Sequence, residues 1–492
     1  MTMTRSARAS IAVLALFTLL AAVAPPAGSE EPQFVAGKRP MSLRECVQIT
    51  LRSNPGLMAA GEQRDAARGR TQQARAPLLP QVNGSGSASI SQSPERQSLI
   101  GGDLRSSPKN RYQQAGVGVS VEQSIIDVSS WKSAAGARAS QASVDASFRT
   151  SQEAIVLAVE RTYYNYLKTI HLLQVAEENL KVGEQQLKLA EKRREVGIGV
   201  EADILKARAQ RAQNELAVIN AEKEVHVAQA TLSHLMGIPL DSPIVVEDIP
   251  PDEAAAPAPQ ADVEAALAAR PEIVDQRHRV RAAEFSLGAA KARRIPTLGF
   301  QFGYDYLLDG RNKTFDQILG SDSRSRISDF DSADGSFVLE TFPTRLDTLD
   351  IVTDSDPYGS WRASLALSLP IFTGGSTRGR INEARALAFA ERANLAQLER
   401  DARLETQTST LNVAAAARAI EVSRDGVLAA EEDLRVTQGS YTQGLLPILN
   451  LVQAQAALVD SRNAFVSATY DYRIALAELD RALGKGVAKY AE

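Results

Sequence analysis

Few residues in this 492-residue chain have the types and spacing that catalysis or metal binding requires. It contains four histidines, His171, His226, His234 and His278, and none belongs to a His-Glu-x-x-His pair. We therefore expect all four to occupy surface positions on helices. The single cysteine, Cys46, allows neither a disulfide within the chain nor a thiolate metal cluster.

Two other segments resemble ligand sites only superficially. Residues 373–376 are Thr-Gly-Gly-Ser, but no lysine follows them as it would in a phosphate-binding loop. We expect a strand-to-helix turn there, with Ser376 as the helix cap. The acidic, serine-rich run 309–356 lacks the glycine-bearing twelve-residue pattern of a calcium loop, so a solvated loop is favoured over loose calcium binding. The sequence thus indicates no enzyme and no cofactor.

Composition excludes one further class of function. The chain is 44% apolar and only 5% aromatic, and its formal net charge is −4. A nucleic-acid binder usually presents a basic face, which this balance makes improbable. The length is sufficient for two or more domains.

The N-terminus has the features of an export signal. Arg5 and Arg8 precede an apolar run at 11–24 that is too short to span a bilayer and is followed by small residues. Cleavage is expected after Ser29, because Pro25 disfavours an earlier site. No later segment approaches the roughly 20 apolar residues of a membrane helix. The exported protein is therefore expected to be either soluble or a β-barrel.

Helical patterns cover most of the chain. Residues 42–52 and 56–76 are expected to form helices, the first with Ser42 and Glu45 at the spacing of a capping box. Much longer patterns pair 128–194 with 200–236, and 376–441 with 447–483. Helices of this length need a partner along their whole length, because packing supplies most helical stability.

The apolar residues of these helices follow a heptad spacing in places. Leu451, Leu458, Phe465, Tyr472 and Leu479 lie seven residues apart, which predicts coiled-coil packing. Core packing is a better explanation of such a stripe than a cofactor site.

Four segments instead alternate with a period of two, as half-buried strands do. They are residues 81–91, 117–123, 299–306 and 361–369. Their apolar faces carry aromatic residues, which suits strands that cross an outer membrane, although a small soluble sandwich has the same pattern. Four strands cannot close a membrane barrel, since the smallest use about eight. If these strands span a membrane, the protein must be an oligomer.

The chain repeats itself. The turn at Gly197 returns at Gly444, an offset of 444 − 197 = 247 residues, and each follows a very long helical pattern and opens a shorter one. Asn54-Pro55 likewise corresponds to Arg270-Pro271. We expect a signal peptide (1–29), a first repeat (30–236), a linker (237–262), a second repeat (263–484) and a short tail (485–492). The repeats carry strand pairs at about 80–126 and 296–370, and helical hairpins at about 128–236 and 376–483.

Several short motifs in this order resemble TolC-like outer-membrane efflux proteins. They are Leu43-Arg44-Glu45-Cys46 followed by Asn54-Pro55, Leu79-Pro80, Ile295-Pro296, the run 367–375, and both glycine turns. The resemblance covers nearly all of the mature length. Ser124 departs from it, because the family usually has proline there.

The resemblance implies a mainly α fold with a membrane β-barrel contribution. Three chains would supply four strands each to one 12-stranded outer-membrane barrel, continuous with a periplasmic α-barrel of long antiparallel hairpins. Such a protein is a passive exit duct for drug or small-molecule efflux or for type I protein secretion. Its partners would be a periplasmic adaptor (membrane fusion protein), an inner-membrane pump of RND, ABC or MFS type, and outer-membrane lipid.

The resemblance also assigns roles to the hairpin turns. Tip residues expected to contact the adaptor are Val196, Gly197, Ile198, Gln443, Gly444 and Leu445. Asp203 and Tyr441 match two linked gate positions, although Asp203 has the simpler interpretation of a solvated residue near a turn. Leu446 stands where an arginine can occur, and Asn450 and Gln453 stand where well-known members have acidic residues. The resemblance therefore implies that the closing hydrogen bond is kept and the acidic ring is not.

A periplasmic coiled-coil adaptor or scaffold is the alternative class. Adaptors contain one helical hairpin flanked by lipoyl-like and barrel segments, whereas this chain has two hairpins and amphipathic strands. The duct is therefore the favoured interpretation.

Overall fold

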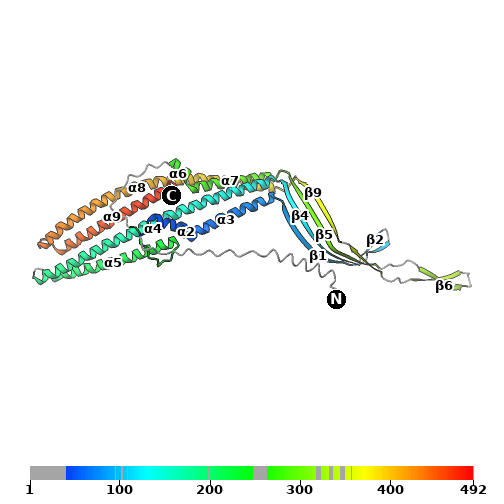
Figure 1. Ribbon diagram of the computed structural model, residues 1–492, viewed down its shortest axis with the longest axis horizontal. Helices are drawn as coiled ribbons and strands as arrows, with labels where there is room; N and C mark the ends of the chain where they lie inside the picture. Colours follow the sequence, from blue (N-terminus) through cyan, green and yellow to red (C-terminus); the bar gives the residue numbers. More distant parts are fainter. Residues whose placement is uncertain are drawn as a thin grey trace. The chain divides into compact units, whose positions relative to one another are not determined.

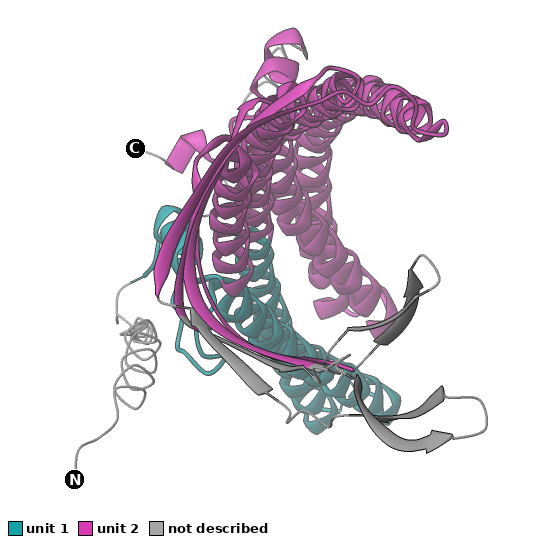
Figure 2. Ribbon diagram, turned by 90° about the vertical axis from the view of Figure 1, so that its right-hand side faces the viewer, with its two compact units in different colours: residues 1–54, 162–250 teal, residues 55–161, 251–492 magenta. Residues whose placement is uncertain are grey.

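The computed structural model describes most of the chain after residue 39 (Figure 1). The expected signal peptide, the tip residue Ile198 and residues 248–262 of the expected linker lie outside the described residues. Two compact units are distinguished in Figure 2: residues 1–54 with 162–250, and residues 55–161 with 251–492. The described ranges are 40–94, 96–100, 103–107, 109–197, 199–247, 263–316, 323–331, 336–343, 349–355 and 357–490.

The first unit begins with helix α2 (Leu43–Ser53). The predicted capping box is present: the amide of Glu45 donates to Ser42 Oγ at 3.3 Å, and the amide of Ser42 donates to Glu45 Oε2 at 3.1 Å. These bonds satisfy amides that a helix start leaves without intrahelical partners. The cap therefore defines where the helical part of the chain starts.

The first helical hairpin joins α4 (Val128–Glu195) to α5 (Glu201–Met236), close to the predicted bounds. Within the first unit, Asn214 of α5 is buried and donates its side-chain amide to the carbonyl of Asn179 in α4 at 3.0 Å. Gly183 faces this amide, and a Cβ at that position would clash with it. The glycine therefore permits the close approach of two long helices.

A short β-bridge fastens the ends of this unit. Met41 and Val246 form a parallel bridge, and the hydroxyl of Tyr163 in α4 donates to the carbonyl of Glu247 at 3.2 Å. Tyr166, one turn further on, donates to the carbonyl of Ile244 at 3.2 Å. Both tyrosines are buried, so the stripe on α4 anchors the chain segments before α2 and after α5.

The second unit holds most of the remaining helices. The predicted heptad is confirmed: Leu451, Leu458, Tyr472 and Leu479 are buried, and Phe465 packs against the core that Val413 and Ile420 of α8 help to form. The helices are α3 (Pro55–Arg75), η1 (Ala76–Leu78), α6 (Val263–Ala269), α7 (Pro271–Ala292), α8 (Ser376–Thr442), α9 (Ile448–Ala482) and η2 (Ala488–Tyr490).

The first part of α4 lies between α3 and α7. Thr71 of α3 donates to the carbonyl of Ala137 at 3.3 Å, and Ser129 donates to the carbonyl of Ala289 in α7 at 3.2 Å. Gly136 meets Phe285, whose Cβ would lie 3.4 Å from an added Cβ. Small residues on α4 thus let α7 pack closely against it.

The four predicted strands are confirmed and form one antiparallel sheet in the order β1-β4-β5-β9. Strand β5 is long enough to pair with β9 over its first half and with β8 over its second. The bounds are β1 (Gln81–Ser93), β4 (Lys109–Ile126), β5 (Thr297–Asp316), β8 (Leu349–Ser355) and β9 (Tyr358–Ser368).

The insertion at 309–356, predicted as a solvated loop, contains strands that were not predicted. Within its described residues, β6 (Ser323–Asp331) pairs with β7 (Ser336–Pro343), and the ends of β5 and β8 pair with each other. The run 337–342 contains two phenylalanines, a valine and a leucine, whose strand propensity was hidden by the surrounding acidic residues. A further pair, β2 (Arg96–Ile100) and β3 (Asp103–Ser107), extends the β1–β4 connection.

Four helices end at glycines in the left-handed region. Gly197 and Gly444 end the long helices with φ of 82° and 79°, and Gly237 and Gly484 end the short ones with φ of 69°. This conformation is open to glycine without a Cβ penalty, as in the common helix-ending motifs. Both pairs have the same offset along the chain, so the repeat extends to the way each hairpin begins and ends.

The expected cap of α8 was assigned to the wrong residue. The N-cap is Gly375, whose φ of 84° turns the chain from the sheet into the helix, and Ser376 is the first helical residue. Thr373 Oγ1 accepts instead from the amide of Thr377 at 3.4 Å. Two successive glycines with positive φ complete the turn early, so the helix starts one residue before the position that a Ser376 cap would give.

Candidate functional site

The two faces of the sheet differ in chemistry. One face exposes Trp361, Leu365 and Leu367, whose side chains are 66–72% accessible, together with the valines of β4. A contiguous exposed apolar face on antiparallel strands is typical of contact with lipid. Within the described sheet, β1 pairs only with β4, and β9 only with β5, so both edges are open. The unit presents an apolar surface and two unpaired strand edges.

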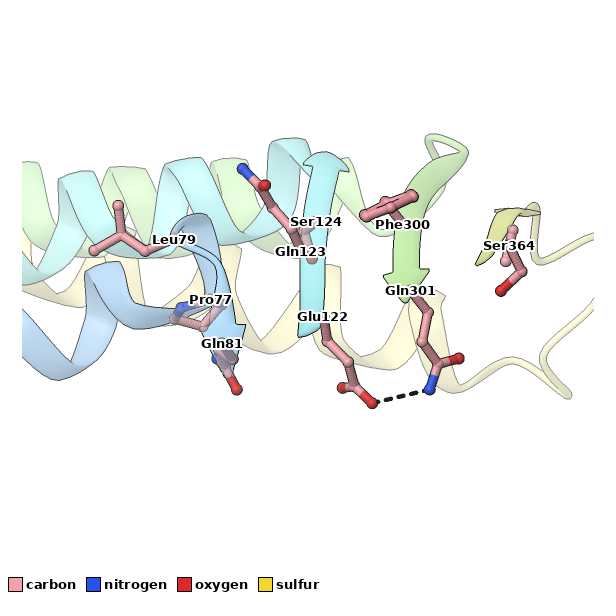
Figure 3. A pocket seen from close by; sticks show the side chains of 11 residues that line it. Pro77, Leu79, Gln81, Glu122, Gln123, Ser124, Phe300, Gln301 and Ser364 are labelled. Carbon is pink, nitrogen blue, oxygen red and sulfur yellow. Dashed lines mark hydrogen bonds between the residues drawn. The ribbon is translucent and has the colours of Figure 1, made fainter. Parts of the chain in front are cut away.

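The opposite face carries a polar row that crosses all four strands. Gln81, Glu122, Gln301 and Ser364 are aligned in the registers of β1, β4, β5 and β9. Gln301 Nε2 donates to Glu122 Oε1 at 3.1 Å, and Figure 3 shows Gln81, Glu122 and Gln301 pointing to the same side. Glu122 thus stands among amide and hydroxyl groups.

A hollow of about 320 Å³ accompanies this row where the sheet meets the helices. The next row of the same face consists of Ser124, Gly299 and Ala366, and these small residues leave the space open. Pro77 and Leu79 form an apolar wall on the side of η1. The arrangement is a shallow polar pocket with one carboxylate.

The first hairpin tip is built from the end of α4 and the start of α5. Val196 is 70% exposed, Gly197 makes the turn, and Arg194 forms an ion pair with Glu201 across it. Asp203 is half-buried in the first turn of α5, and its amide donates to the carbonyl of Val200 at 3.0 Å. A carboxylate is favoured there by the helix dipole.

The second tip brings together the remaining predicted site residues. Gln443 is the C-cap of α8, Gly444 makes the turn, and Leu445 is 71% exposed. Tyr441 is buried, Leu446 is half-buried, and Asn450 and Gln453 are exposed on the first turns of α9. Asp203 and Tyr441 belong to different compact units, so a hydrogen bond between them stays a prediction.

One expectation about the histidines was wrong. His171 is buried, and its Nδ1 lies 3.0 Å from Gln174 Oε1. It follows Tyr163 and Leu167 at intervals of four residues, which places it on their buried side of α4. His226 and His234 are exposed and His278 is half-buried.

The part of the chain that the structure describes offers neither a metal site nor a reactive thiol. Among these residues, no group of three histidine, cysteine, aspartate or glutamate side chains could hold a metal ion. Cys46 is buried, and burial, with a smaller effect from Glu45, raises the pKa of its thiol to about 12. A thiol of this kind is inert. None of the described helices has both the length and the apolarity needed to cross a bilayer.

Sequence reasoning missed a charged cluster in the second unit. Arg270 is 2% exposed, and one of its terminal nitrogens lies 2.6 Å from Glu405 Oε2. Nearby, burial and the charge of Glu272 raise the pKa of Glu153 to about 7, although Arg481 and Arg270 oppose this shift. The sequence did contain a signal for this cluster, because charged residues are rarely buried in a helical core unless they are paired.

Sequence reasoning also missed the alignment of the polar row. The alternation places Gln81, Glu122 and Gln301 on polar faces, but only the pairing register shows that they are neighbours.

Comparison with known proteins agrees with this architecture. Residues 46–238 and 263–485 match the outer membrane efflux protein family, so the chain belongs to that family. It is 23% identical to the outer membrane protein TolC of Vibrio cholerae, over 90% of each chain. It is 24% identical to the alkaline protease secretion protein AprF of Pseudomonas aeruginosa, covering 89% of this chain and 83% of that one. A solved structure of CusC superposes with a TM-score of 0.71 at 18% identity, covering 94% and 97%.

Membership of this family defines what the chain does. It is an outer-membrane exit duct for efflux or secretion, with a large periplasmic part, and it is a channel and not an enzyme. The fold predicted from the sequence, with long helical hairpins, four strands and an internal repeat, is confirmed. The alternative of a periplasmic adaptor is excluded, because the match spans both repeats of an outer-membrane family.

Proposed function

We propose that three copies of the chain close their sheets into one 12-stranded barrel. The observation that carries this proposal is the sheet order, because β1 and β9 are edges with one partner each in the described sheet. In lipid, an open edge leaves backbone groups unpaired at a cost of several kcal/mol each. Pairing β1 of one copy with β9 of the next removes every such edge, and three copies supply enough strands.

The two faces of the sheet orient this barrel. The face that carries Trp361, Leu365 and Leu367 contacts lipid, so the row containing Glu122 lines the interior. The insertion at 309–356 is the extracellular loop of the second strand pair, and the helical hairpins form the periplasmic tunnel. An epitope at Ser336 is expected to be labelled on intact cells.

The hairpin tips are the proposed docking sites for a periplasmic adaptor, which connects the duct to an inner-membrane pump of RND, ABC or MFS type. Support comes from Val196 and Leu445, which expose about 70% of apolar side chains at the two turns. Apolar residues that project from a turn cost solvation free energy unless a partner covers them. Ile198, Gln443 and the two turn glycines complete the proposed contact set.

The same tips are proposed to control the opening of the duct. Asp203 accepts a hydrogen bond from Tyr441 in the closed state, while Leu446, Asn450 and Gln453 line the aperture. The support for these roles is that each residue lies within ten residues of the turn glycine, Gly197 or Gly444, of its tip. Because Asn450 and Gln453 are uncharged, this aperture lacks an acidic ring.

Cysteine cross-linking tests the shared barrel. Ser85 of β1 is replaced by cysteine in combination with Ser360, Arg362 or Ser364 of β9, three positions on the polar face that sample the unknown register. Cys46 is buried and inert, so it does not interfere. Oxidation in outer membranes should link chains into trimers in at least one combination, and single-cysteine variants should give none. Ladders that continue beyond three chains, or no linkage in any combination, would refute the proposal.

A further inference from the structure

The polar row at the helical end of the sheet contains one carboxylate and no cationic side chain. Its members are Gln81, Glu122, Gln301 and Ser364, aligned across four strands. Gln301 Nε2 donates a hydrogen bond to Oε1 of Glu122. Among the described residues, Oε2 of Glu122 has no hydrogen-bond or ion-pair partner. Glu122 itself lines the hollow beside the row.

On the same face, the two rows that follow Gln301 along β5, at residues 303 and 305, contain charges that partly cancel. Arg362 of β9 lies opposite Gly303, and Asp305 of β5 lies opposite Ser360, so the two are diagonal neighbours. The carboxylate of Asp305 lies over Gly118, where the absence of a Cβ makes room for it. Glu122 is separated from Arg362 by strand β5. The row of Glu122 therefore keeps an uncompensated negative charge.

Placed in the proposed barrel, this row becomes a ring. Neighbouring strands lie about 4.8 Å apart, so copies of Glu122 would recur every 19 Å or so along the wall, and their side chains would converge toward the axis. Three carboxylates on the wall of a water-filled pore attract cations and repel anions. The attraction weakens as salt is added, because dissolved ions screen the carboxylates. The screening length is about 10 Å at 0.1 M.

We infer that Glu122, framed by Gln81, Gln301 and Ser364, forms a cation-attracting ring that makes the duct select cations over anions at the helical end of its barrel. This inference rests on the proposed trimeric barrel. Small inorganic cations and organic ammonium groups are the ligands, because each Glu122 offers one carboxylate oxygen and neighbouring amide and hydroxyl oxygens. The ring lies on the sheet and is separate from the aperture at the hairpin tips.

The experiment measures reversal potentials of the reconstituted full-length mature protein in planar bilayers under a potassium chloride gradient. At about 0.1 M salt, Glu122→Gln should lower the cation-to-anion permeability ratio roughly twenty-fold, an estimate from three screened carboxylates about 7 Å from a passing ion, which favour the cation and disfavour the anion equally. Arg362→Gln should change the ratio in the opposite direction. Asp241→Asn removes the same charge from an exposed loop after α5 and should leave the ratio unchanged.

A chemical rescue separates charge from structure. Glu122→Cys should lose selectivity, and an anionic thiosulfonate added to assembled channels should restore it, whereas a cationic one should favour anions. Equal ratios in conducting wild-type and Glu122→Gln channels, or a rescue that ignores the reagent's charge, would overturn the inference while leaving the duct intact. A wild-type protein that forms no channel would overturn the proposed function and this inference with it.

Discussion

Arg270 Nε donates a hydrogen bond to the carbonyl oxygen of Ala482 at 2.8 Å, across 212 residues of sequence. In the first repeat, Asn54 Nδ2 donates to the carbonyl of Leu235 at 2.8 Å. Each donor precedes a proline that starts a helix, and each acceptor lies in the last turn of its repeat's short helix. The final carbonyls of a helix lack intrahelical partners. Both repeats therefore close on themselves by the same contact, made with different side chains.

Replacing Arg270 by alanine should destabilise the second unit strongly. The change removes the bond to Ala482 and also separate bonds to Glu405 and Thr406 at 2.6 and 3.2 Å. Breaking a buried, hydrogen-bonded charge contact typically costs about 3–5 kcal/mol. The urea midpoint of the purified protein measures the loss. Arg277→Ala is the control, because its contact with Glu399 at 3.4 Å is exposed and is worth about 0–1 kcal/mol. Equal effects of the two substitutions would contradict this account.

Replacing Glu153 by glutamine should stabilise the protein at pH 8 but not at pH 4. Burial, then Glu272, raises the pKa of Glu153 from 4.5 to about 7, so the folded state binds this proton more tightly than the unfolded state. The associated stability is complete below about pH 4.5 and is lost as the pH rises through 7. Glutamine imitates the protonated form at every pH. Urea midpoints from pH 4 to 8 should therefore diverge as the pH rises, and a variant less stable than wild type at pH 8 would show that the ionised form is needed.

Local elements were largely predictable from the sequence. The heptad of α9, the alternation in β5 and the glycines at 197 and 444 each act within a few residues, and these predictions held. His171 was misassigned although its spacing from Tyr163 and Leu167 already placed it on a buried stripe. In that case the signal was present and was not used.

Contacts between distant segments were not predictable. The acceptors of Arg270 lie 135, 136 and 212 residues away, and Gln301 is 179 residues from Glu122. A polar residue in a strand or before a proline does not specify such partners, because pairing register and helix packing decide them. For the same reason, the polar row follows from the alignment of four strands and not from any one of them.

Loss of the Tyr441 hydroxyl should open the tip. If Tyr441 donates to Asp203 in the closed state, the bond is worth roughly 1.5–3 kcal/mol, as for other hydrogen bonds to charged groups. Tyr441→Phe should then raise single-channel conductance in planar bilayers, and Asp203→Ala should add little to it. Additive effects of the two substitutions would indicate that the residues do not share a bond.

Block by trivalent cations reports on the charge of the aperture. Asn450 and Gln453 are uncharged and exposed on the first turns of α9, so cations added from the periplasmic side should block wild-type channels weakly. Asn450→Asp adds one carboxylate per chain and should strengthen the block. Asn463→Asp, a partly buried position further along α9, serves as the matched control. Tight block of wild type that Asn450→Asp leaves unchanged would place the narrowest point elsewhere.

The number of chains in one conducting assembly tests the central claim most directly. Four strands per chain require three chains to reach the proposed 12-stranded barrel, so native mass spectrometry of the detergent-solubilised outer-membrane protein should give three times the mass of one mature chain. The same preparation should conduct in planar bilayers without an energy source. An assembly that conducts with any other number of chains would contradict the shared barrel.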